Sequence, residues 1–346
     1  MLVEILIITI FLIAIILAFV SHLPKQNRSN VILFGIILIL IATFRDGADR
    51  DYYNYVAYYD SIQIGDIFIE PTFWLISLLV RVILFDNVIF LFLIYAILGV
   101  GLKMMAIKEL TNLWLLSIAI YISFYYILQD LTQIRSGVAT GIFLLSLKPL
   151  YERKLKLYIV HCTIAAAFHY SAILLFPLVF LRGQKMNIWL YATLIPASYS
   201  LYFLGISFYE ILAYIPIDFI QQKVILYIRL AGISDGETLN VFSNLQLMRC
   251  SICFFILWKK DLIHEHNRYV LLLIKIYIIS IALFVLFVDI PVFAFRASEL
   301  LGIVEIIVVP LLIYAFASSR LRLVFPMIVG AFLIYIQLFY IGLLAN

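Results

Sequence analysis

Charged residues are scarce in this sequence. Asp, Glu, Lys and Arg make up 13% of its 346 residues, whereas 66% are hydrophobic. With a mean hydropathy of +1.12, the chain has too little polar surface to cover a water-soluble globule. The composition therefore predicts a polytopic membrane protein. The net charge of +4 comes mostly from the loops between apolar runs and indicates no nucleic-acid partner.

Cysteine is also rare. Cys162, Cys250 and Cys253 all stand in apolar segments, so they offer no disulfide framework. Cys250 and Cys253 form a C-x-x-C inside a predicted span, where packing is the favoured interpretation. The first apolar run, 2–20, has no basic region before it and no small-residue cleavage site after it. We therefore expect a retained helix there rather than a signal peptide.

Long apolar runs fill most of the chain. The run 156–181 is long enough to contain a break near Ala167 to His169, and 70–102 predicts a second broken or re-entrant element. We expect an all-α, polytopic membrane helix bundle in which 1–346 forms a single transmembrane domain of about 10 to 13 crossing or re-entrant elements. The predicted spans lie near 2–20, 31–44, 70–85, 86–106, 112–128, 134–148, 156–181, 188–208, 241–258, 269–289, 293–317 and 322–344.

Lys and Arg gather in alternate connections, which the positive-inside rule makes cytoplasmic. The other connections would face outward, including extracytoplasmic loops near 45–69 and 209–240, the turn at 129–135 and the neighbourhood of His169. The expected cytoplasmic markers are Lys25, Arg28, Lys103, Lys108, Lys148, Arg153, Lys154, Lys156, Arg182, Lys185, Lys259, Lys260, Arg268, Arg320 and Arg322.

Three arginines, Arg45, Arg135 and Arg296, stand beside apolar segments at the outward face. An arginine at membrane depth costs about 3 kcal/mol, so it usually lines a wet cavity or has a specific partner. Together the three predict an anion site, because a guanidinium stays charged and its planar fork matches phosphate oxygens. The alternative is pairing with near neighbours: Arg45 with Asp46 or Asp49, Arg135 with Asp130, and Arg296 with Glu299.

His169, in "AAAFHYSAILL", lies at the outward end of a predicted span. The unperturbed pKa of histidine, near 6.5, suits a general base that takes a proton from a sugar hydroxyl. A core histidine with satisfied hydrogen bonds is the alternative. Arg135 is followed by Gly137 and Gly141, a small-xxx-small spacing that lets another helix approach closely and would hold Arg135 rigidly.

The stretch "FRDGADRDYYNYVAYYD", residues 44–60, is polar and rich in tyrosine among apolar runs. It predicts a short amphipathic helix at the membrane surface, with rings that stack on a glycan and Asp49 and Asp51 bonding to sugar hydroxyls. An ordinary interfacial tyrosine belt is the alternative. Asp49 and Asp51 also form a D-x-D motif, which binds a metal ion in many glycosyltransferases. That motif belongs on a soluble nucleotide-binding domain, which this sequence lacks. The tyrosines that share one helix face are Tyr52, Tyr55 and Tyr59.

The succession of segments resembles a known family. "FRDGADRDYYNYVAYYD" is followed by "IEPTFWLI", "LTQIRSGVATGIFLLSL", "AAAFHYSAILL" and "FAFRASELLGI". This order is similar to the landmarks of the EpsG-like, or more broadly Wzy-type, bacterial polysaccharide polymerases, and it extends from about Arg45 to about Leu312. The sequence departs from the family pattern at Gly47, one residue early, and at Ser298-Glu299-Leu300, which replaces an aromatic pair.

The resemblance implies a metal-independent, cofactor-free glycosyltransferase of GT-C-like architecture at the extracytoplasmic face of a bacterial inner membrane. Such polymerases move a growing glycan from undecaprenyl pyrophosphate onto a lipid-linked repeat unit, building O-antigen, capsule or exopolysaccharide. The implied partners are these lipid-linked oligosaccharides, membrane lipid and a chain-length co-polymerase. The implied roles are pyrophosphate binding by Arg45, Arg135 and Arg296, base catalysis by His169 or Asp49, and glycan binding by Asp51, Tyr52, Tyr55, Tyr59, Glu70 and Glu299.

Other functions stay open on the residues alone. A lipid-linked oligosaccharide transporter would also gather arginines in the membrane, although inverted repeats would be expected and none is visible. An O-antigen ligase would use the same donor with a different acceptor, and a larger outward domain than 209–240 would be expected. A membrane O-acyltransferase is the third alternative.

Overall fold

The computed structural model describes residues 2–20, 28–61, 70–206 and 239–344, and the regular structure in these ranges is entirely helical. The expected all-α membrane class is confirmed. By length and composition, four helical segments can cross a membrane, and a bent pair makes a fifth. The four are α1 (Leu2–Val20), α5 (Ile89–Leu110), α6 with η1 (Trp114–Thr132) and the Arg320–Tyr340 part of α17 (Ser319–Tyr335) with η4 (Ile336–Tyr340).

The bent pair joins α15 (Pro291–Gly302) to α16 (Glu305–Leu311) and η3 (Leu312–Ala315), with 52° between its halves. Six further apolar helices among the described residues are only 10–17 residues long. They are α2 (Arg28–Thr43), α4 (Pro71–Ile83), α8 (Leu155–Phe168), η2 (Tyr170–Phe180), α12 (Asn244–Trp258) and α14 (Val270–Leu286). The remaining elements are α3 (Tyr52–Ser61), α7 (Ile134–Tyr151), α9 (Ile188–Phe203) and α13 (Lys260–His264).

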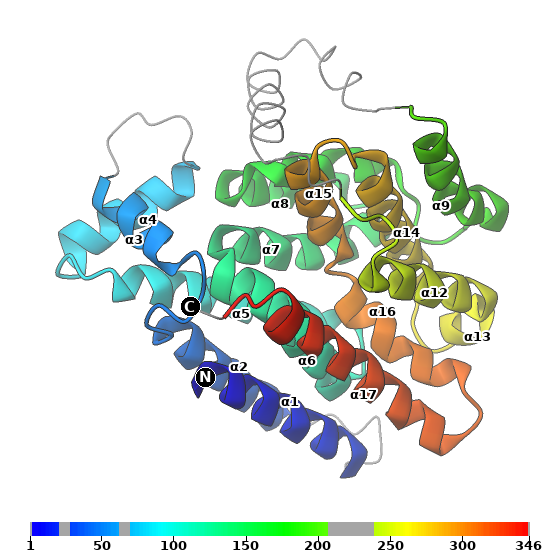
Figure 1. Ribbon diagram of the computed structural model, residues 1–346, viewed down its shortest axis with the longest axis horizontal. Helices are drawn as coiled ribbons and strands as arrows, with labels where there is room; N and C mark the ends of the chain where they lie inside the picture. The colour runs from blue at the N-terminus through cyan, green and yellow to red at the C-terminus, as the bar shows by residue number, and fades with distance from the viewer. Residues whose placement is uncertain (1, 21–27, 62–69, 207–238, 345–346) are drawn as a thin grey trace.

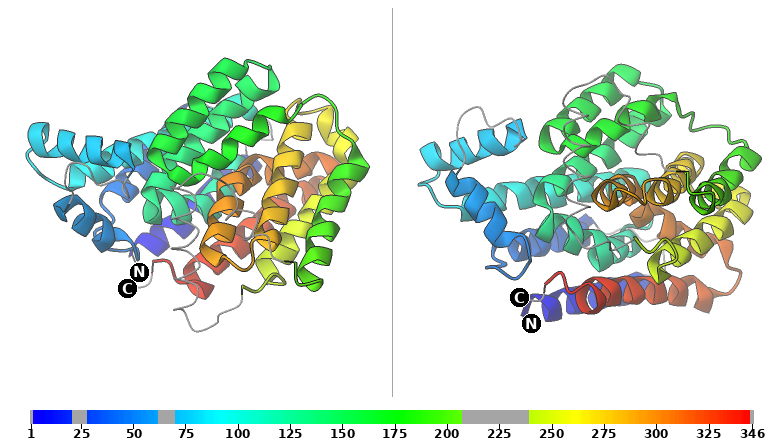
Figure 2. Two further views of the ribbon diagram at one scale, coloured as in Figure 1. Left: turned by 90° about the horizontal axis from the view of Figure 1, so that it is seen from above. Right: turned by 45° about the horizontal axis from the view of Figure 1, so that its top comes forward.

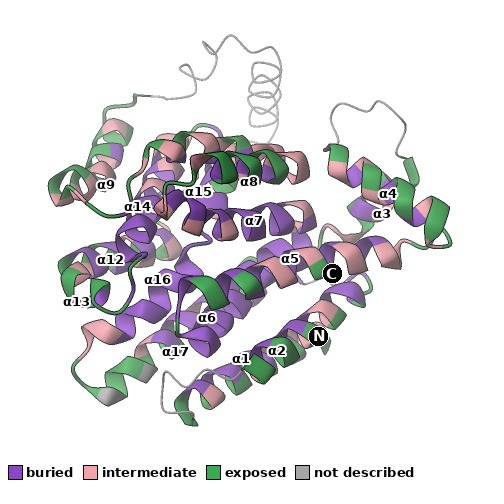
Figure 3. Ribbon diagram, turned by 180° about the vertical axis from the view of Figure 1, so that it is seen from behind, coloured by how far each residue is buried: buried purple, intermediate pink, exposed green. Residues whose placement is uncertain are grey.

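The centre of the bundle is the segment formed by α6 and η1. Every residue of these two elements is buried, and α1, α5, α7, α16 and α17 pack against them (Figures 1 and 3). Helices α1 and α17 lie side by side along one edge, and α3 and α4 project from one side (Figures 1 and 2). The segment Trp114–Thr132 has the lowest hydropathy of the four candidate spans and is the one wholly enclosed by protein, whereas the most apolar span, α1, lies at the edge of the bundle.

Both predicted breaks are present. Helix α8 ends at Phe168, His169 has an extended backbone with φ −153°, and η2 begins at Tyr170. Between α4 and α5, Phe85 and Asp86 take positive φ values of 61° and 52°, which side-chain-bearing residues rarely adopt. The chain therefore turns sharply at both places.

The two long loops that are expected to face outward are described only in part. Of the predicted loop 45–69, residues 45–61 form a turn and helix α3, and 62–69 lie outside the described residues. Of the loop 209–240, only residues 239 and 240 are described. The C-x-x-C cysteines both lie in α12 as free thiols, in agreement with the packing interpretation.

Close packing of α5 against α7 depends on small residues, as the spacing of Gly137 and Gly141 predicts. A Cβ at Gly141 would lie 2.9 Å from the Leu102 Cβ, and one at Gly137 would lie 2.8 Å from the Gln129 carbonyl oxygen. Gly99 of α5 is equally constrained, because a Cβ there would overlap Oδ1 of Asp130. These contacts fix where the N-terminal turn of α7 lies.

We predict that Gly99→Ala lowers the unfolding free energy by about 1–3 kcal/mol, because the added methyl meets a fixed carboxylate. Gly101→Ala is the matched control in the same helix, since a Cβ at Gly101 has no atom within 4 Å, and it should gain up to about 1 kcal/mol of helix propensity. Thermal unfolding of the detergent-solubilised variants measures both. Equal melting temperatures for the two variants would contradict the packing described for Gly99.

Candidate functional site

Three side chains that are far apart in the sequence come together, because two of them contact the carboxylate of the third. Glu70 immediately precedes α4, Arg135 lies in the first turn of α7, and His169 occupies the break between α8 and η2. Nη1 of Arg135 donates to Oε2 of Glu70, and Nδ1 of His169 lies 3.0 Å from Oε1. Glu70 is buried, whereas the Arg135 and His169 side chains keep 21% and 11% of their surface exposed. This Glu70–Arg135–His169 cluster is the candidate site.

The Glu-Pro element positions Glu70. Proline at the first turn of α4 favours extended backbone in the preceding residue, and Glu70 accordingly has φ −61° and ψ 140°. The hydroxyl of Thr72 donates to the Ala167 carbonyl oxygen at 2.7 Å, one of the carbonyls that the end of α8 leaves without a helical partner. This bond joins the start of α4 to the end of α8 and places Glu70 beside His169.

Arg135 rests among aromatic rings. Its Cζ lies 5.6 Å from the ring centroids of Tyr55 and Phe73 and 5.8 Å from that of Tyr58. Such distances allow favourable attraction between a cation and the ring faces. The rings hold the guanidinium in place while its edge remains partly exposed.

The electrostatics of the cluster define a proton arrangement. Burial alone would raise the pKa of the Glu70 carboxyl, but hydrogen bonding to His169 and the charge of Arg135 outweigh it and lower the pKa to about 2. An ionised carboxylate only accepts hydrogen bonds, so Nδ1 of His169 is the donor. In the neutral imidazole this leaves the lone pair on Nε2, which can accept a proton from a hydroxyl.

Arg45 and Asp49 form a separate pair, as the near-neighbour alternative for Arg45 predicts. Nε of Arg45 donates to Oδ2 of Asp49 at 2.5 Å, and Nη1 donates to the Ala42 carbonyl oxygen at 2.6 Å. Both side chains are almost fully buried, and Arg45 lies 4.2 Å from the Phe92 ring centroid. The backbone N–H of Asp51 donates to the other oxygen of Asp49, so both oxygens of this second candidate base already have partners.

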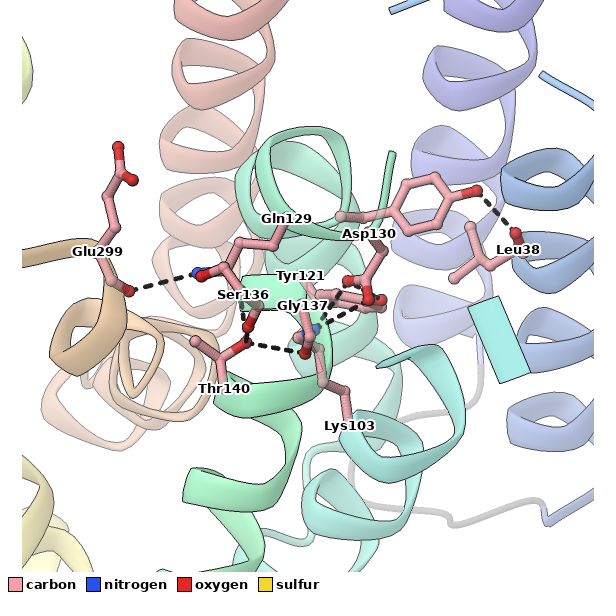
Figure 4. A network of polar contacts seen from close by, with 10 residues as sticks. Leu38, Lys103, Tyr121, Gln129, Asp130, Ser136, Gly137, Thr140 and Glu299 are labelled. Carbon is pink, nitrogen blue, oxygen red and sulfur yellow. Dashed lines mark hydrogen bonds and ion pairs between the residues drawn. The ribbon is translucent and has the colours of Figure 1, made fainter. Parts of the chain in front are cut away.

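The late-span residues Arg296 and Glu299 lie on α15. Arg296 is exposed and close enough to His169 and Glu299 to act electrostatically on both. The backbone carbonyl of Glu299 accepts a hydrogen bond from Nε2 of Gln129 at 3.4 Å (Figure 4). This bond holds α15 against η1 and brings Arg296 towards the Glu70–Arg135–His169 cluster.

The tyrosine face of α3 turns inward. Tyr55 and Tyr59 are buried, and the Tyr59 hydroxyl donates to Oδ1 of Asp86 at 2.5 Å. Tyr52 stacks on Phe92 with 4.8 Å between ring centroids. The exposed tyrosines of this helix are instead Tyr53 and Tyr58, at 66% and 44%.

Comparison with known proteins identifies the chain. The model of the EpsG family matches residues 30–345. The chain belongs to the EpsG family. No curated protein and no solved structure matches it. Family membership implies a membrane protein of the polysaccharide-polymerase kind and agrees with the resemblance that the ordered motifs show.

No group of three or more His, Cys, Asp or Glu side chains that could hold a metal ion occurs within residues 2–20, 28–61, 70–206 and 239–344 of this EpsG-family chain. In the D-x-D sequence, Asp49 is paired with Arg45, and Oδ1 of Asp51 accepts from the Asn54 side chain at 3.3 Å. The Asp49 and Asp51 side chains of the D-x-D sequence therefore both have partners within the protein.

Sequence reasoning missed a buried ion pair near the start of α7. Lys103 was expected to mark a cytoplasmic turn, but this is wrong, because Lys103 lies inside α5 and is fully buried. Its Nζ donates to both oxygens of Asp130, at 3.0 and 2.9 Å, and to the Gly137 carbonyl oxygen at 2.6 Å (Figure 4). The Tyr121 hydroxyl donates to Asp130 as well. Asp130 is therefore the partner of Lys103, and Arg135 pairs with Glu70.

A second buried pair joins Arg249 of α12 to Glu305 of α16. Nη2 of Arg249 lies 3.1 Å from Oε2 of Glu305, which also accepts from the hydroxyl of Tyr125, while the Tyr277 hydroxyl donates to Oε1. Both residues stand in the middle of apolar runs, where an ionisable side chain indicates a specific role. That signal was present in the sequence, and the structure places the pair at the bend between α15 and α16.

We predict that Lys103→Met lowers the unfolding free energy by about 3–5 kcal/mol, because it leaves Asp130 charged and uncompensated in the core. Lys108→Met, on the exposed side of the same helix, should leave stability nearly unchanged. Adding Asp130→Leu to Lys103→Met should restore part of the loss. Thermal unfolding in detergent measures all three, and equal melting points for Lys103→Met and Lys108→Met would show that the pair is dispensable.

Proposed function

We propose that this protein is a metal-independent repeat-unit polysaccharide polymerase. It would transfer a growing glycan from undecaprenyl pyrophosphate to a lipid-linked repeat unit at the extracytoplasmic face of a bacterial inner membrane. The observation that carries the proposal is the Glu70–Arg135–His169 cluster within a helical membrane protein of the EpsG family. The cluster combines a partly exposed cation with an oriented imidazole.

The chemistry follows from these groups. An acceptor hydroxyl attacks the anomeric carbon of the donor sugar while the bond from that carbon to the pyrophosphate oxygen breaks. Nε2 of His169 takes the hydroxyl proton, a contribution of about 10²–10⁴-fold in rate for a well-placed general base. Arg135 stabilises the negative charge that grows on the departing pyrophosphate. Glu70 holds both groups in place.

The other arginines have supporting roles in this proposal. Arg296 adds positive charge on the side of α15, close to His169. Arg45 is tied to Asp49 and stabilises the turn that leads into α3. The undecaprenyl chains of donor and acceptor would lie against the apolar outer surfaces of the helices, together with membrane lipid.

The first test uses the polymer made in the host. A deletion strain is complemented with the wild-type gene or with Arg135→Ala at matched protein level, and the extracted glycan is separated on a gel. We expect the long ladder to collapse to a single repeat unit on its final acceptor in Arg135→Ala, because the leaving group loses its counter-charge. Arg28→Ala, at the exposed start of α2, is the control and should give a normal ladder.

Other outcomes of this experiment separate the alternatives. Loss of every repeat from the final acceptor would indicate ligation or transport of the lipid-linked unit instead of polymerisation. An unchanged ladder in Arg135→Ala would refute the assigned role of this arginine.

Glu70 supports a second prediction. Glu70→Gln keeps the shape of the side chain but removes the charge that pairs with Arg135 and the acceptor that orients His169, so we expect loss of the long ladder comparable to that of Arg135→Ala. Glu109→Gln, which breaks the surface pair with Lys148, is the matched control and should leave the ladder intact. A normal ladder in Glu70→Gln, with protein levels equal, would mean that the carboxylate does not organise the site.

A further inference from the structure

The exposed side of α3 carries a row of sugar-compatible side chains that ends beside Arg135. We infer that Asp51, Asn54 and Tyr58 form a glycan-binding row, and that the ring of Tyr58 stacks on the sugar next to the pyrophosphate. This inference rests on the proposed function and deepens it, because it names the residues that contact the glycan.

The position of Tyr58 carries the argument. Its ring centroid lies 5.8 Å from Cζ of Arg135, and 44% of the residue is exposed. The ring packs edge-on against the buried ring of Tyr55, with 6.5 Å between centroids, so one aromatic ring supports the other. If Arg135 holds the pyrophosphate, the sugar attached to it is one bond away and reaches the nearest exposed aromatic ring. Tyr58 is the exposed ring among the three that surround Arg135.

The remaining residues of the row fit the same ligand class. Asp51, Asn54 and Tyr58 are spaced i, i+3 and i+7, which places them along one side of a helix. The Asn54 amide donates to Oδ1 of Asp51 at 3.3 Å, which keeps both side chains on the surface. A pyranose has hydroxyls at its edge and C–H bonds on its face, so it suits polar groups beside an aromatic ring.

The exposed side of α3 is unsuited to acyl chains. Asn54 and Ser61 are exposed there together with Tyr58, and an amide is costly in hydrocarbon. This side of the helix therefore faces water or a polar ligand. A glycan matches the row in both respects: its hydroxyls can bond to the polar side chains, and its C–H face can stack on the tyrosine ring.

The test uses the full protein reconstituted in liposomes and the lipid-linked repeat unit extracted from the deletion strain. We expect Tyr58→Ala to raise the substrate concentration for half-maximal polymerisation about three- to tenfold, as loss of one aromatic contact does, with little change in maximal rate. Tyr58→Phe and Tyr58→Trp should stay near wild type, because they keep the ring. Tyr53→Ala removes a more exposed ring of the same helix that is not among the rings around Arg135, and polymerisation by this variant should be unaffected.

Binding of the same lipid-linked unit to the same liposomes is measured in parallel, which separates this inference from the proposed function. If wild type binds the unit and does not polymerise it, while Tyr58→Ala weakens binding, the sugar contact stands and the polymerase assignment fails. If wild type polymerises and Tyr58→Ala matches Tyr53→Ala, the inference is overturned. A Tyr58→Phe variant as impaired as Tyr58→Ala would also overturn it, because the hydroxyl and not the ring would then matter.

Discussion

The ion pair between Lys103 and Asp130 is the constraint on which the arrangement of the bundle depends. It joins α5 to η1, and its third bond, to the Gly137 carbonyl, joins both to α7. A buried pair of this kind contributes little net stability compared with apolar packing, but removing one partner is expensive because a charge is then left without compensation. The pair therefore acts as a positional constraint: these helices pack well only in the register that brings Lys103 to Asp130.

This constraint reaches the candidate site along α7. Gly137, whose carbonyl binds Lys103, lies two residues after Arg135, and small residues at positions 99 and 137 bring the backbones close to Asp130. The first turn of α7 thus has little freedom to shift. On its other side, Arg135 meets the Glu70 carboxylate, which Pro71 and Thr72 hold against the end of α8. The Lys103–Asp130 pair in the core and the Glu70–Arg135 pair together fix the position and direction of the Arg135 guanidinium, as the proposed role of this residue requires.

Much of this architecture could be predicted from the sequence because it depends on local composition. Apolar runs gave the helices, and the break at His169 followed from a run too long for one span. The small-residue spacing after Arg135 correctly predicted close packing. The partner of Arg135 could not be predicted in this way, because Glu70 is 65 positions away in the chain and its approach depends on how α4 meets α8. Lys103 was misassigned because counting charges cannot separate a loop lysine from one that a distant carboxylate neutralises.

Burial distinguishes Arg45, whose charge is neutralised in place, from Arg135, whose charge remains accessible. Arg45 has a carboxylate of its own four residues later, in the turn between α2 and α3, and its side chain is only 1% exposed, so its charge is neutralised in place. Arg135 shares its carboxylate with His169 and keeps 21% of its side chain exposed. In the proposed reaction, a pyrophosphate would replace solvent at Arg135 without breaking the ion pair, whereas at Arg45 it would first have to displace Asp49. A single glutamate thus serves two residues and places the imidazole beside the cation. In the proposed reaction, proton removal from the acceptor and stabilisation of the leaving group would then occur within one cluster.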